Sequence, residues 1–368
     1  MDSRLDLIEP DGLGPSKTLI LRDPRSGLRA FVVVDNTACG PSIGGIRMAP
    51  DVSIPEVARL ARAMTFKNAA AGLPHGGGKA GIVGDPSMPA DQKQALVRAF
   101  ARSIASLTEY IPGPDMGLDE RSMAYIHDEI GRAVGLPRVL GGIPLDEIGA
   151  TGFGLAIAAE VAAPQAGIKL QDARVAVQGF GAVGVHAARF LADRGAILVA
   201  ASDSHGGIYN GQGLAWADLA AHKGKGLPLS TFPGGQTLTP EQFVGVACDI
   251  WIPAARPDVL TSDNVGHLTA RLVLQGANIP ATPAAERWMH EHGVLNIPDF
   301  IANAGGVICA SVEYHGGTES QAMTVIEERV RRNTAEVLAL AKQGQMSPRE
   351  AAVNLATARI EEAMRYRR

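Results

Sequence analysis

Residues 173–195 read ARVAVQGFGAVGVHAARFLADRG, and this stretch decides the fold class of the chain. The leading ARVAVQ is apolar enough for a buried strand, and the trailing VHAARFLADR has the spacing of an amphipathic helix. Between them stands G-x-G-x-x-G, in which Gly179 permits a tight turn, Gly181 lets a ligand approach the backbone and Gly184 lets helix and strand pack closely. The stretch therefore predicts a dinucleotide site made by Gly179, Phe180, Gly181, Ala182, Val183 and Gly184.

A carboxylate follows at the end of the next predicted strand, where Asp203 lies about 20 residues beyond Gly184. An acidic side chain in this position can accept hydrogen bonds from the adenosine ribose hydroxyls, which favours NAD as the cofactor. Ser202, Ser204 and His205 could instead accommodate a 2′-phosphate, so NADP stays open.

Strands and helices alternate after this unit, which predicts an α/β fold with a doubly wound parallel sheet. A glycine- and proline-rich segment at 137–144 precedes the alternation and predicts a hinge between two domains. We expect an α/β substrate domain over 1–140, a Rossmann domain over 141–334, and C-terminal helices in 335–368 that pack back on the first domain. The strands predicted for the Rossmann domain are 174–178, 197–201, 249–252, 272–274 and 294–297.

The first domain is predicted to mix short strands with helices. Residues 30–34 form an apolar, β-branched run that indicates a strand. A helix is expected to begin at Ser53, which forms an S-x-x-E capping box with Glu56, and to end near Gly72. Further helices are predicted over 91–107 and 119–134.

Composition is that of an ordinary globular protein, with 368 residues, a formal net charge of −4 and 46% hydrophobic residues. The charge argues against a nucleic-acid or anionic-membrane partner. Three dispersed cysteines indicate a reducing compartment, and no histidine or cysteine pattern indicates a metal site. The N-terminal residues lack the apolar core of a signal peptide and no stretch is long enough to span a membrane, so we expect a cytoplasmic protein.

Two lysines and one aspartate of the first domain have unusual surroundings. Lys67 continues the apolar face of its predicted helix, either as a snorkelling lysine at a helix end or as a grip on a substrate carboxylate. Lys79 follows three glycines in PHGGGKAG, which clear side chains from around its amine and prepare it as a base if it is desolvated near a second cation. Asp115, in GPDMG, is by itself typical of a turn aspartate.

Six segments occur in the order found in one enzyme family: TFKNAAAGLPHGGGKAGI, PGPDMG, GATGFG, GFGAVG, QGANIPAT and NAGGV. From about residue 31 to residue 313, the chain resembles the glutamate/leucine/phenylalanine/valine dehydrogenases. The resemblance implies a substrate domain followed by a Rossmann domain, a homo-oligomer, and reversible NAD-linked oxidative deamination of an L-amino acid to its 2-oxo acid and ammonium.

The resemblance also implies residue roles. Lys67 would bind the substrate α-carboxylate, Lys79 would activate the hydrolytic water, and Asp115 would shuttle protons to and from the substrate nitrogen. The residues implied to lie near the nicotinamide are Thr151 and Asn278, and the one near the substrate amine is Asn303.

Positions around the substrate side chain distinguish the branches of this family. Glutamate enzymes carry a lysine where this chain has Ile43, and a serine where it has Ala310. Without both groups a second carboxylate would be left unpaired, so the pocket resembles the apolar-substrate branch, although QGANIPAT and IYNGQG are closer to the glutamate branch. Small residues at 113 and 310 leave volume that favours phenylalanine, tryptophan or leucine. The predicted pocket residues are Ile43, Gly113, Val307 and Ala310.

Two alternatives remain open from the sequence. One is a glutamate dehydrogenase that has replaced its side-chain anchors, for which Arg47 is the candidate cation. The other is a non-catalytic NAD-binding sensor, since fold alone does not establish chemistry. The presence of Lys67, Lys79 and Asp115 together argues against a sensor, because a pure binder needs none of them.

Overall fold

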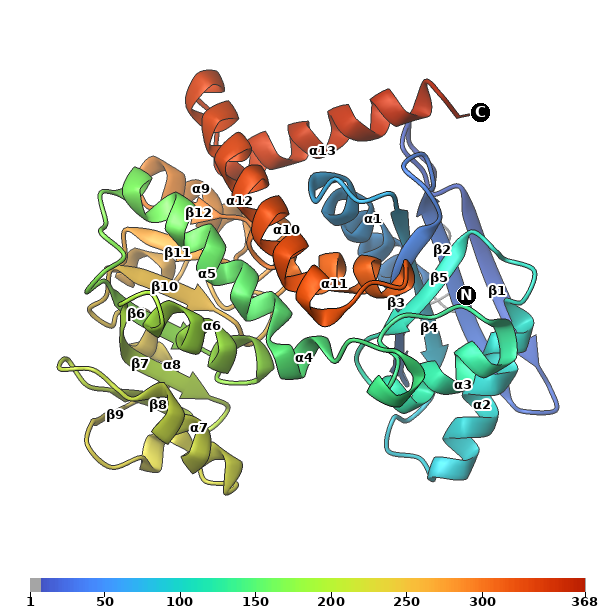
Figure 1. Ribbon diagram of the computed structural model, residues 1–368, viewed down its shortest axis with the longest axis horizontal. Coiled ribbons are helices and arrows are strands. Elements are labelled where there is room, and N and C mark those ends of the chain that lie inside the picture. The colour runs from blue at the N-terminus through green and yellow to red at the C-terminus, as the bar shows by residue number, and fades with distance from the viewer. Residues whose placement is uncertain (1–7, 368) are drawn as a thin grey trace. The chain divides into compact units, whose positions relative to one another are not determined.

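The structure is a computed structural model that describes residues 8–367. By its internal contacts the chain divides into two compact units, which are described separately (Figure 1). Within the described residues, unit 1 comprises 8–145, 307–322 and 353–367, and unit 2 comprises 146–306 and 323–352.

The unit boundary near residue 145 directly follows the glycine- and proline-rich segment, but the C-terminal part differs from expectation. Residues 307–322, expected in the Rossmann domain, belong to unit 1, because Ala310 packs against the Ile43 cluster there. Residues 335–352, expected to pack on the first domain, belong to unit 2. The helix that contains 335–344 is bound there by Arg331, which pairs with Glu160.

Unit 1 is built on a five-stranded mixed sheet in the order β1-β2-β4-β3-β5. Strands β4, β3 and β5 run parallel, β2 is antiparallel to β4, and β1 is antiparallel to β2. The strands are β1 (Lys17–Asp23), β2 (Leu28–Asn36), β3 (Ser42–Ala49), β4 (Gly76–Val83) and β5 (Tyr110–Pro114). The helices are α1 (Ile54–Ala70), α2 (Ala90–Ser103), α3 (Glu120–Ile130), the 3₁₀ helix η2 (Arg138–Leu140) and α11 (Gly305–Tyr314), most of which lies in this unit.

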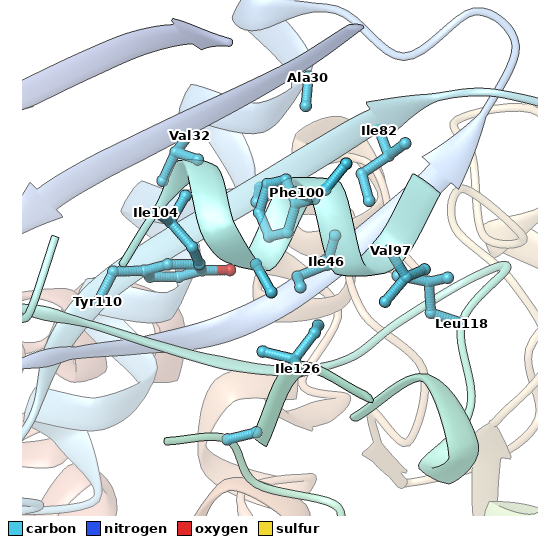
Figure 2. Close-up of a cluster of buried hydrophobic side chains, with 14 of the residues drawn as sticks. Ala30, Val32, Ile46, Ile82, Val97, Phe100, Ile104, Tyr110, Leu118 and Ile126 are labelled. Carbon is cyan, nitrogen blue, oxygen red and sulfur yellow. The ribbon is translucent and has the colours of Figure 1, made fainter. Parts of the chain in front are cut away.

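Both faces of this sheet are covered, which explains why residues 30–34 of β2 are consecutive buried apolar residues. Alternate residues point to opposite faces, so Val32 packs toward α2 and α3 while Val33 packs toward α1. Figure 2 shows Phe100 of α2 surrounded by side chains of the strands, among them Val32 and Ile82. Lys79 pairs with Val33 in register, so its side chain lies on the α1 face.

The ends of the unit 1 helices refine the sequence predictions. Helix α3 ends at Ile130 because Gly131 adopts a left-handed conformation with φ of 68°, four residues before the expected end. Ser53 caps α1 by accepting the backbone N–H of Glu56 at 3.4 Å. The carboxylate of Glu56 does not complete the expected capping box, because it bonds to Arg47 instead.

Unit 2 contains a seven-stranded sheet in the order β12-β11-β10-β6-β7-β8-β9. The first five strands run parallel and confirm the doubly wound fold, whereas β8 and β9 add an antiparallel edge that the sequence did not indicate. Both added strands are too short to show a hydrophobic period. The strands are β6 (Arg174–Gln178), β7 (Ile197–Asp203), β8 (Gly206–Tyr209), β9 (Gln236–Leu238), β10 (Ile250–Pro253), β11 (Leu272–Leu274) and β12 (Leu295–Ile297).

The helices of unit 2 include α6, which follows the glycine turn, and the long helix α12, most of which belongs to this unit. No helix among residues 8–367 combines the length and the apolarity needed to cross a membrane. Four of the described helices contain a unit boundary: α4 (Leu145–Ile148), α11, α12 (Glu319–Gly344) and α13 (Pro348–Met364). The others are α5 (Ala150–Ala162), α6 (Ala182–Ala192), α7 (Trp216–Gly224), α8 (Pro240–Val244), α9 (Pro283–Glu291), α10 (Asp299–Ala302) and the 3₁₀ helices η3 (Ala163–Ala166), η4 (Leu229–Thr231) and η5 (Val265–His267).

The core beneath α2 makes a testable contribution to stability. Phe100→Ala removes a fully buried ring and should lower the free energy of unfolding of unit 1 by about 3–5 kcal/mol. Denaturant unfolding measures this change. Val139→Ala, at a side chain that is 89% exposed, is the control and should stay within about 0.5 kcal/mol of wild type. A loss below about 1 kcal/mol for Phe100→Ala would contradict the packing described here.

Candidate active site

An ion pair spans three strands of the unit 1 sheet. Lys79 lies on β4, Asp115 directly follows β5, and β3 runs between them. The Nζ of Lys79 lies 2.9 Å from Oδ2 of Asp115. The two side chains meet beside Gly45, where a Cβ would stand 2.7 Å from Cβ of Asp115 and 3.2 Å from Nζ of Lys79. The pair therefore depends on the absence of a side chain at this position of β3.

Arg47 extends the ion pair along β3. It lies two residues after Gly45, so its side chain faces the same side of the sheet. Its Nε lies 3.1 Å from Oδ2 of Asp115, and its Nη1 lies 2.6 Å from Oε1 of Glu56 in the first turn of α1. The result is a chain of alternating charges in the order Lys79, Asp115, Arg47 and Glu56.

Burial and charge together tune the acid–base properties of the pair. Only 9% of the Lys79 side chain is exposed, and burial lowers the pKa of its amine, an effect that attraction to Asp115 only partly offsets. Burial alone would raise the pKa of Asp115, but Lys79 and Arg47 outweigh it and the pKa lies below its usual value. An amine with a lowered pKa beside an ionised carboxylate is suited to proton transfer near neutral pH.

The glycines before Lys79 serve a different purpose from the one expected. A Cβ at Gly77 would lie 2.1 Å from the backbone nitrogen of Thr65 on α1, and one at Gly78 would lie 2.7 Å from Oγ of Ser42. These positions are already filled by protein atoms, so they leave no space for a ligand. Gly77 lets α1 pack directly on β4, and Gly78 lets the side chain of Ser42 on β3 approach it.

Lys67 lies in the last turn of α1 and is half-buried. The neighbouring residue Asn68 fixes this end of the helix on the sheet, because its Nδ2 donates to the carbonyl of Gly76 at 2.7 Å. The helix thus holds Lys67 in the same unit as Lys79 and Asp115.

The predicted side-chain pocket forms an apolar cluster within unit 1. Ile43, Ile111 and Val134 are buried together, and Ala310 of α11 packs against them. Ile43 shares a face of β3 with Gly45, about 7 Å along the strand, so the apolar cluster begins next to the ion pair.

Gly113 does not provide the open volume that the sequence suggested. A Cβ there would lie 3.1 Å from Cγ2 of Val134, so Val134 already occupies that space. Val307 is half-buried at the start of the same α11 segment that carries Ala310.

Glu313 fixes α11 to the loop that contains Val134. Its two carboxylate oxygens accept the backbone N–H groups of Leu136 and Ile143, each at 3.0 Å. Burial raises the pKa of this carboxyl group. Because Ala310 and Glu313 are three residues apart, they lie on the same side of the helix, and these bonds help to position the pocket wall.

In unit 2 the glycine turn lies at the carboxyl end of β6, between β10 and β7, where the strand order reverses. Gly179 has a φ of 90°, and a Cβ at Gly184 would lie 1.9 Å from the carbonyl oxygen of Gly179. A Cβ at Gly181, by contrast, would meet no atom within 4 Å. Two glycines therefore pack the turn and the third opens it to a ligand, as a pyrophosphate at the N-terminus of α6 requires.

Asp203 is less available than the sequence suggested. Its Oδ1 accepts the backbone N–H of His205 at 2.8 Å, its Oδ2 accepts that of Leu229 at 3.1 Å, and only 6% of its side chain is exposed. The Nζ of Lys223 lies 3.8 Å from the same Oδ2. The carboxylate is thus already bound within the protein, which weakens the expectation that it binds the ribose.

The remaining predicted residues of unit 2 lie near one another. The Nδ2 of Asn303 donates to Oδ1 of Asn278 at 3.2 Å, and a Cβ at Gly306 would lie 3.1 Å from Oγ1 of Thr151. Oδ1 of Asn303 is buried and accepts no hydrogen bond from the described residues. An unpaired buried acceptor of this kind fits the N–H of a bound amide or ammonium group.

Two family models match nearly the whole chain. The model described as glutamate/leucine/phenylalanine/valine dehydrogenase matches residues 141–368, and the one described as the dimerisation domain of the same enzymes matches residues 15–132. The chain belongs to this family. The resemblance inferred from the six segments is confirmed, although the models do not distinguish the apolar-substrate branch.

Relatives within the family differ in the cofactor that their names give. The catabolic NAD-specific glutamate dehydrogenase of Bacillus subtilis is 38% identical over 76% of this chain and 68% of its own length. The NADP(+)-dependent glutamate dehydrogenase of Pyrobaculum calidifontis is 36% identical over 92% of this chain and 86% of its own.

Two solved structures of relatives share the fold. The Leu-bound hetero-hexameric glutamate dehydrogenase of Thermus thermophilus has a TM-score of 0.85 and 31% identity, covering 96% of this chain and 90% of the other. The L-tryptophan dehydrogenase of Nostoc punctiforme has a TM-score of 0.75 and 25% identity, covering 96% and 97%.

The family resemblance put Lys79 and Asp115 in one site, but the sequence did not indicate that Gly45, Arg47 and Glu56 adjoin them, and Arg47 was considered only as a possible cation for a glutamate side chain. Gly45 and Arg47 stand in the segment GPSIGGIR, whose alternation along a strand is the signal that puts both on one face. Glu56 was assigned to a helix cap, and nothing local to α1 indicates that β3 supplies its partner.

Because a Cβ at Gly181 would meet no protein atom, we expect a substitution there to affect dinucleotide binding without affecting the stability of the protein. Gly181→Ala should leave the thermal midpoint near that of wild type but weaken dinucleotide binding at least about tenfold, because the added methyl group occupies the space left for the phosphates. Fluorescence titration with reduced dinucleotide measures the affinity. Gly184→Ala is the matched variant and should lower the thermal midpoint, since its Cβ collides with the turn. Unchanged affinity in Gly181→Ala would rule out this phosphate site.

Proposed function

We propose that the protein catalyses the reversible, NAD-dependent oxidative deamination of an apolar L-amino acid to its 2-oxo acid and ammonium. Family membership supports an amino-acid dehydrogenase, and the proposal concerns the substrate class, the cofactor and the residue roles. The observation that carries it is the buried Lys79–Asp115 pair with an apolar cluster next to it on β3.

The proposal gives roles to three side chains of unit 1 and to the cofactor. When bound, the nicotinamide supplies the two-electron oxidant for the Cα–H bond. Lys67 holds the α-carboxylate of the substrate. The amine of Lys79 takes a proton from the water that attacks the iminium carbon, and Asp115 moves protons to and from the nitrogen as the carbinolamine collapses to 2-oxo acid and ammonium.

The surroundings of Ile43 support an apolar substrate. A second carboxylate placed against Ile43 and Ile111 would lose its hydration without gaining a partner, at a cost of several kcal/mol. Arg47, the cation that the alternative requires, already contacts Asp115 and Glu56. Val134 fills the space next to Gly113, so Gly113 leaves no room for a bulky substrate side chain. A preference for bulky substrates therefore depends on the small size of Ala310.

NAD, homo-oligomerisation and a cytoplasmic location complete the proposal. The negative charge of Asp203 at the end of β7 disfavours an additional phosphate, but Lys223 lies close enough to offset part of it, so we expect a modest preference for NAD over NADP. The match of residues 15–132 to a dimerisation domain supports self-association. The cytoplasmic location is proposed from composition and cysteine usage.

Glutamate is the second candidate substrate, because the two curated relatives described above are named glutamate dehydrogenases. It would require a cation facing Ile43, whereas the side chains that pack with Ile43 are apolar and Arg47 is paired with Asp115 and Glu56.

A panel of single amino acids tests the proposal directly. NAD should be reduced faster with leucine, phenylalanine, valine or tryptophan than with glutamate at alkaline pH. The absorbance of the reduced nicotinamide measures this rate. Lys79→Ala should lower kcat at least about 100-fold, because it removes the base. Lys93→Ala, at a partly exposed lysine of α2, is the matched control and should retain wild-type turnover.

The outcomes separate the alternatives. Turnover of glutamate alone would keep the dehydrogenase and overturn the apolar pocket. Retained turnover in Lys79→Ala would overturn the role of that amine. Dinucleotide binding without turnover of any amino acid, in either direction and with either cofactor, would favour a sensor.

A further inference from the structure

Arg47 takes no part in the reaction steps proposed above, yet it contacts the acid–base pair as closely as the two reacting groups contact each other. Its Nε lies 3.1 Å from Oδ2 of Asp115, and Nζ of Lys79 lies 2.9 Å from the same oxygen. Two cations therefore share one carboxylate oxygen. This arrangement needs an explanation beyond the role of Asp115 in proton transfer.

The elements packed around Asp115 each contribute a charged or titratable group. Lys79 comes from β4, Arg47 from β3 and Glu56 from the first turn of α1. Tyr110 of β5 belongs to the cluster on the α2 side of the sheet, where its buried hydroxyl donates to the carbonyl of Gly44 at 2.9 Å and burial raises its pKa well above the usual value. Tyr110 thus stays neutral. Arg47 supplies the second positive charge that acts on Asp115.

A neighbouring cation favours the deprotonated form of an amine and of a carboxyl group alike. Arg47 accordingly lowers the pKa of Lys79 and also that of Asp115. In the proposed reaction the working state has Lys79 uncharged and Asp115 ionised, so both groups must lose a proton to reach it. The two effects of Arg47 act in the same direction.

We propose that Arg47 is a positioning residue that holds Oδ2 of Asp115 and sets the lower pH limit at which the Lys79–Asp115 pair is active. This inference rests on the proposed function. It assigns Arg47 no contact with the substrate and no proton transfer of its own.

Glu56, the last member of the chain of charges, acts on the pKa of Lys79 in the direction opposite to Arg47. Its Oε1 lies 2.6 Å from Nη1 of Arg47, and its negative charge opposes the effect of Arg47 on Lys79. Removing the charge of Glu56 and removing that of Arg47 should therefore shift the pH dependence in opposite directions. A purely structural role for Arg47 would not produce this opposition.

The test compares the pH dependence of kcat/KM for oxidative deamination in wild type and four variants. Arg47→Met removes the charge and should move the rising limb of the profile up by about one pH unit. Arg47→Lys keeps the charge and should restore the limb toward its wild-type position. Glu56→Gln should move it down by a smaller amount.

Arg98→Met serves as the distant control. Arg98 pairs with two carboxylates, Asp128 and Glu129, as Arg47 does, but it lies on α2 away from the site. Its loss should leave the rising limb unchanged, which distinguishes a local effect from a general loss of positive charge in unit 1.

A second measurement needs neither turnover nor cofactor. Carbamylation of the Lys79 amine by cyanate proceeds through its uncharged form, and peptide mass spectrometry follows it as a function of pH. Its midpoint should rise in Arg47→Met relative to wild type and fall in Glu56→Gln. If Arg47→Met does not fold, Arg47→Lys and Glu56→Gln still carry both measurements.

The two measurements separate this inference from the proposed function. If wild type deaminates no amino acid, the proposed function fails, whereas the carbamylation midpoints still report on Arg47. If wild type is active and the profiles of wild type and Arg47→Met coincide, Arg47 does not set the pH limit. An equal loss of kcat in Arg47→Met and Arg47→Lys without any shift would also overturn the inference.

Discussion

An ammonium group inside a protein needs an anion beside it, and much of unit 1 is arranged around this requirement of Lys79. Asp115 supplies the anion, Gly45 leaves the space in which the two side chains meet, and Arg47 contacts the same carboxylate oxygen from β3. Glu56 ends the chain of charges nearer to solvent, with 30% of its side chain exposed. Removal of Asp115 would leave the buried ammonium of Lys79 without its anion, so this carboxylate is the member of the chain on which the others depend.

The candidate site of unit 1 is formed by side chains, whereas that of unit 2 is formed by the backbone. Unit 1 relies on side chains that three parallel strands bring together, and its geometry is therefore sensitive to the spacing of those strands. Unit 2 relies on the backbone, since the turn after β6 offers peptide N–H groups at the start of α6 and needs glycines for shape alone. Neighbouring charges can adjust the pKa of a side chain in unit 1, whereas the turn in unit 2 either leaves space for a phosphate or does not.

The order of β6, glycine turn and α6 could be predicted from the sequence because all its determinants are local: hydrophobic period, glycine spacing and length. The same holds for the parallel strands that follow it. The edge strands β8 and β9 could not be predicted because they hold only four and three residues; β8 depends on pairing with β7, and β9 depends on pairing with β8. Lys79 and Asp115 were identified through a resemblance to a family, whereas the part played by Arg47 and Glu56 depends on a contact between β3 and α1 that no local pattern encodes. The assignment of residues 307–322 to unit 1 likewise depends on packing between distant segments.

The glycines at 76–78 have a consequence for how this gene can change. Every nucleotide substitution that alters the amino acid specified by a glycine codon adds at least a Cβ or ends the chain, and along β4 each such atom would lie within 3 Å of a neighbouring segment. Three consecutive codons are thus open only to silent mutation unless the surroundings change at the same time. Purifying selection on this stretch would follow from the packing of neighbouring segments on β4, before any demand of the chemistry at Lys79. Invariance there across descendants of this gene would record steric exclusion and would be no measure of catalytic importance.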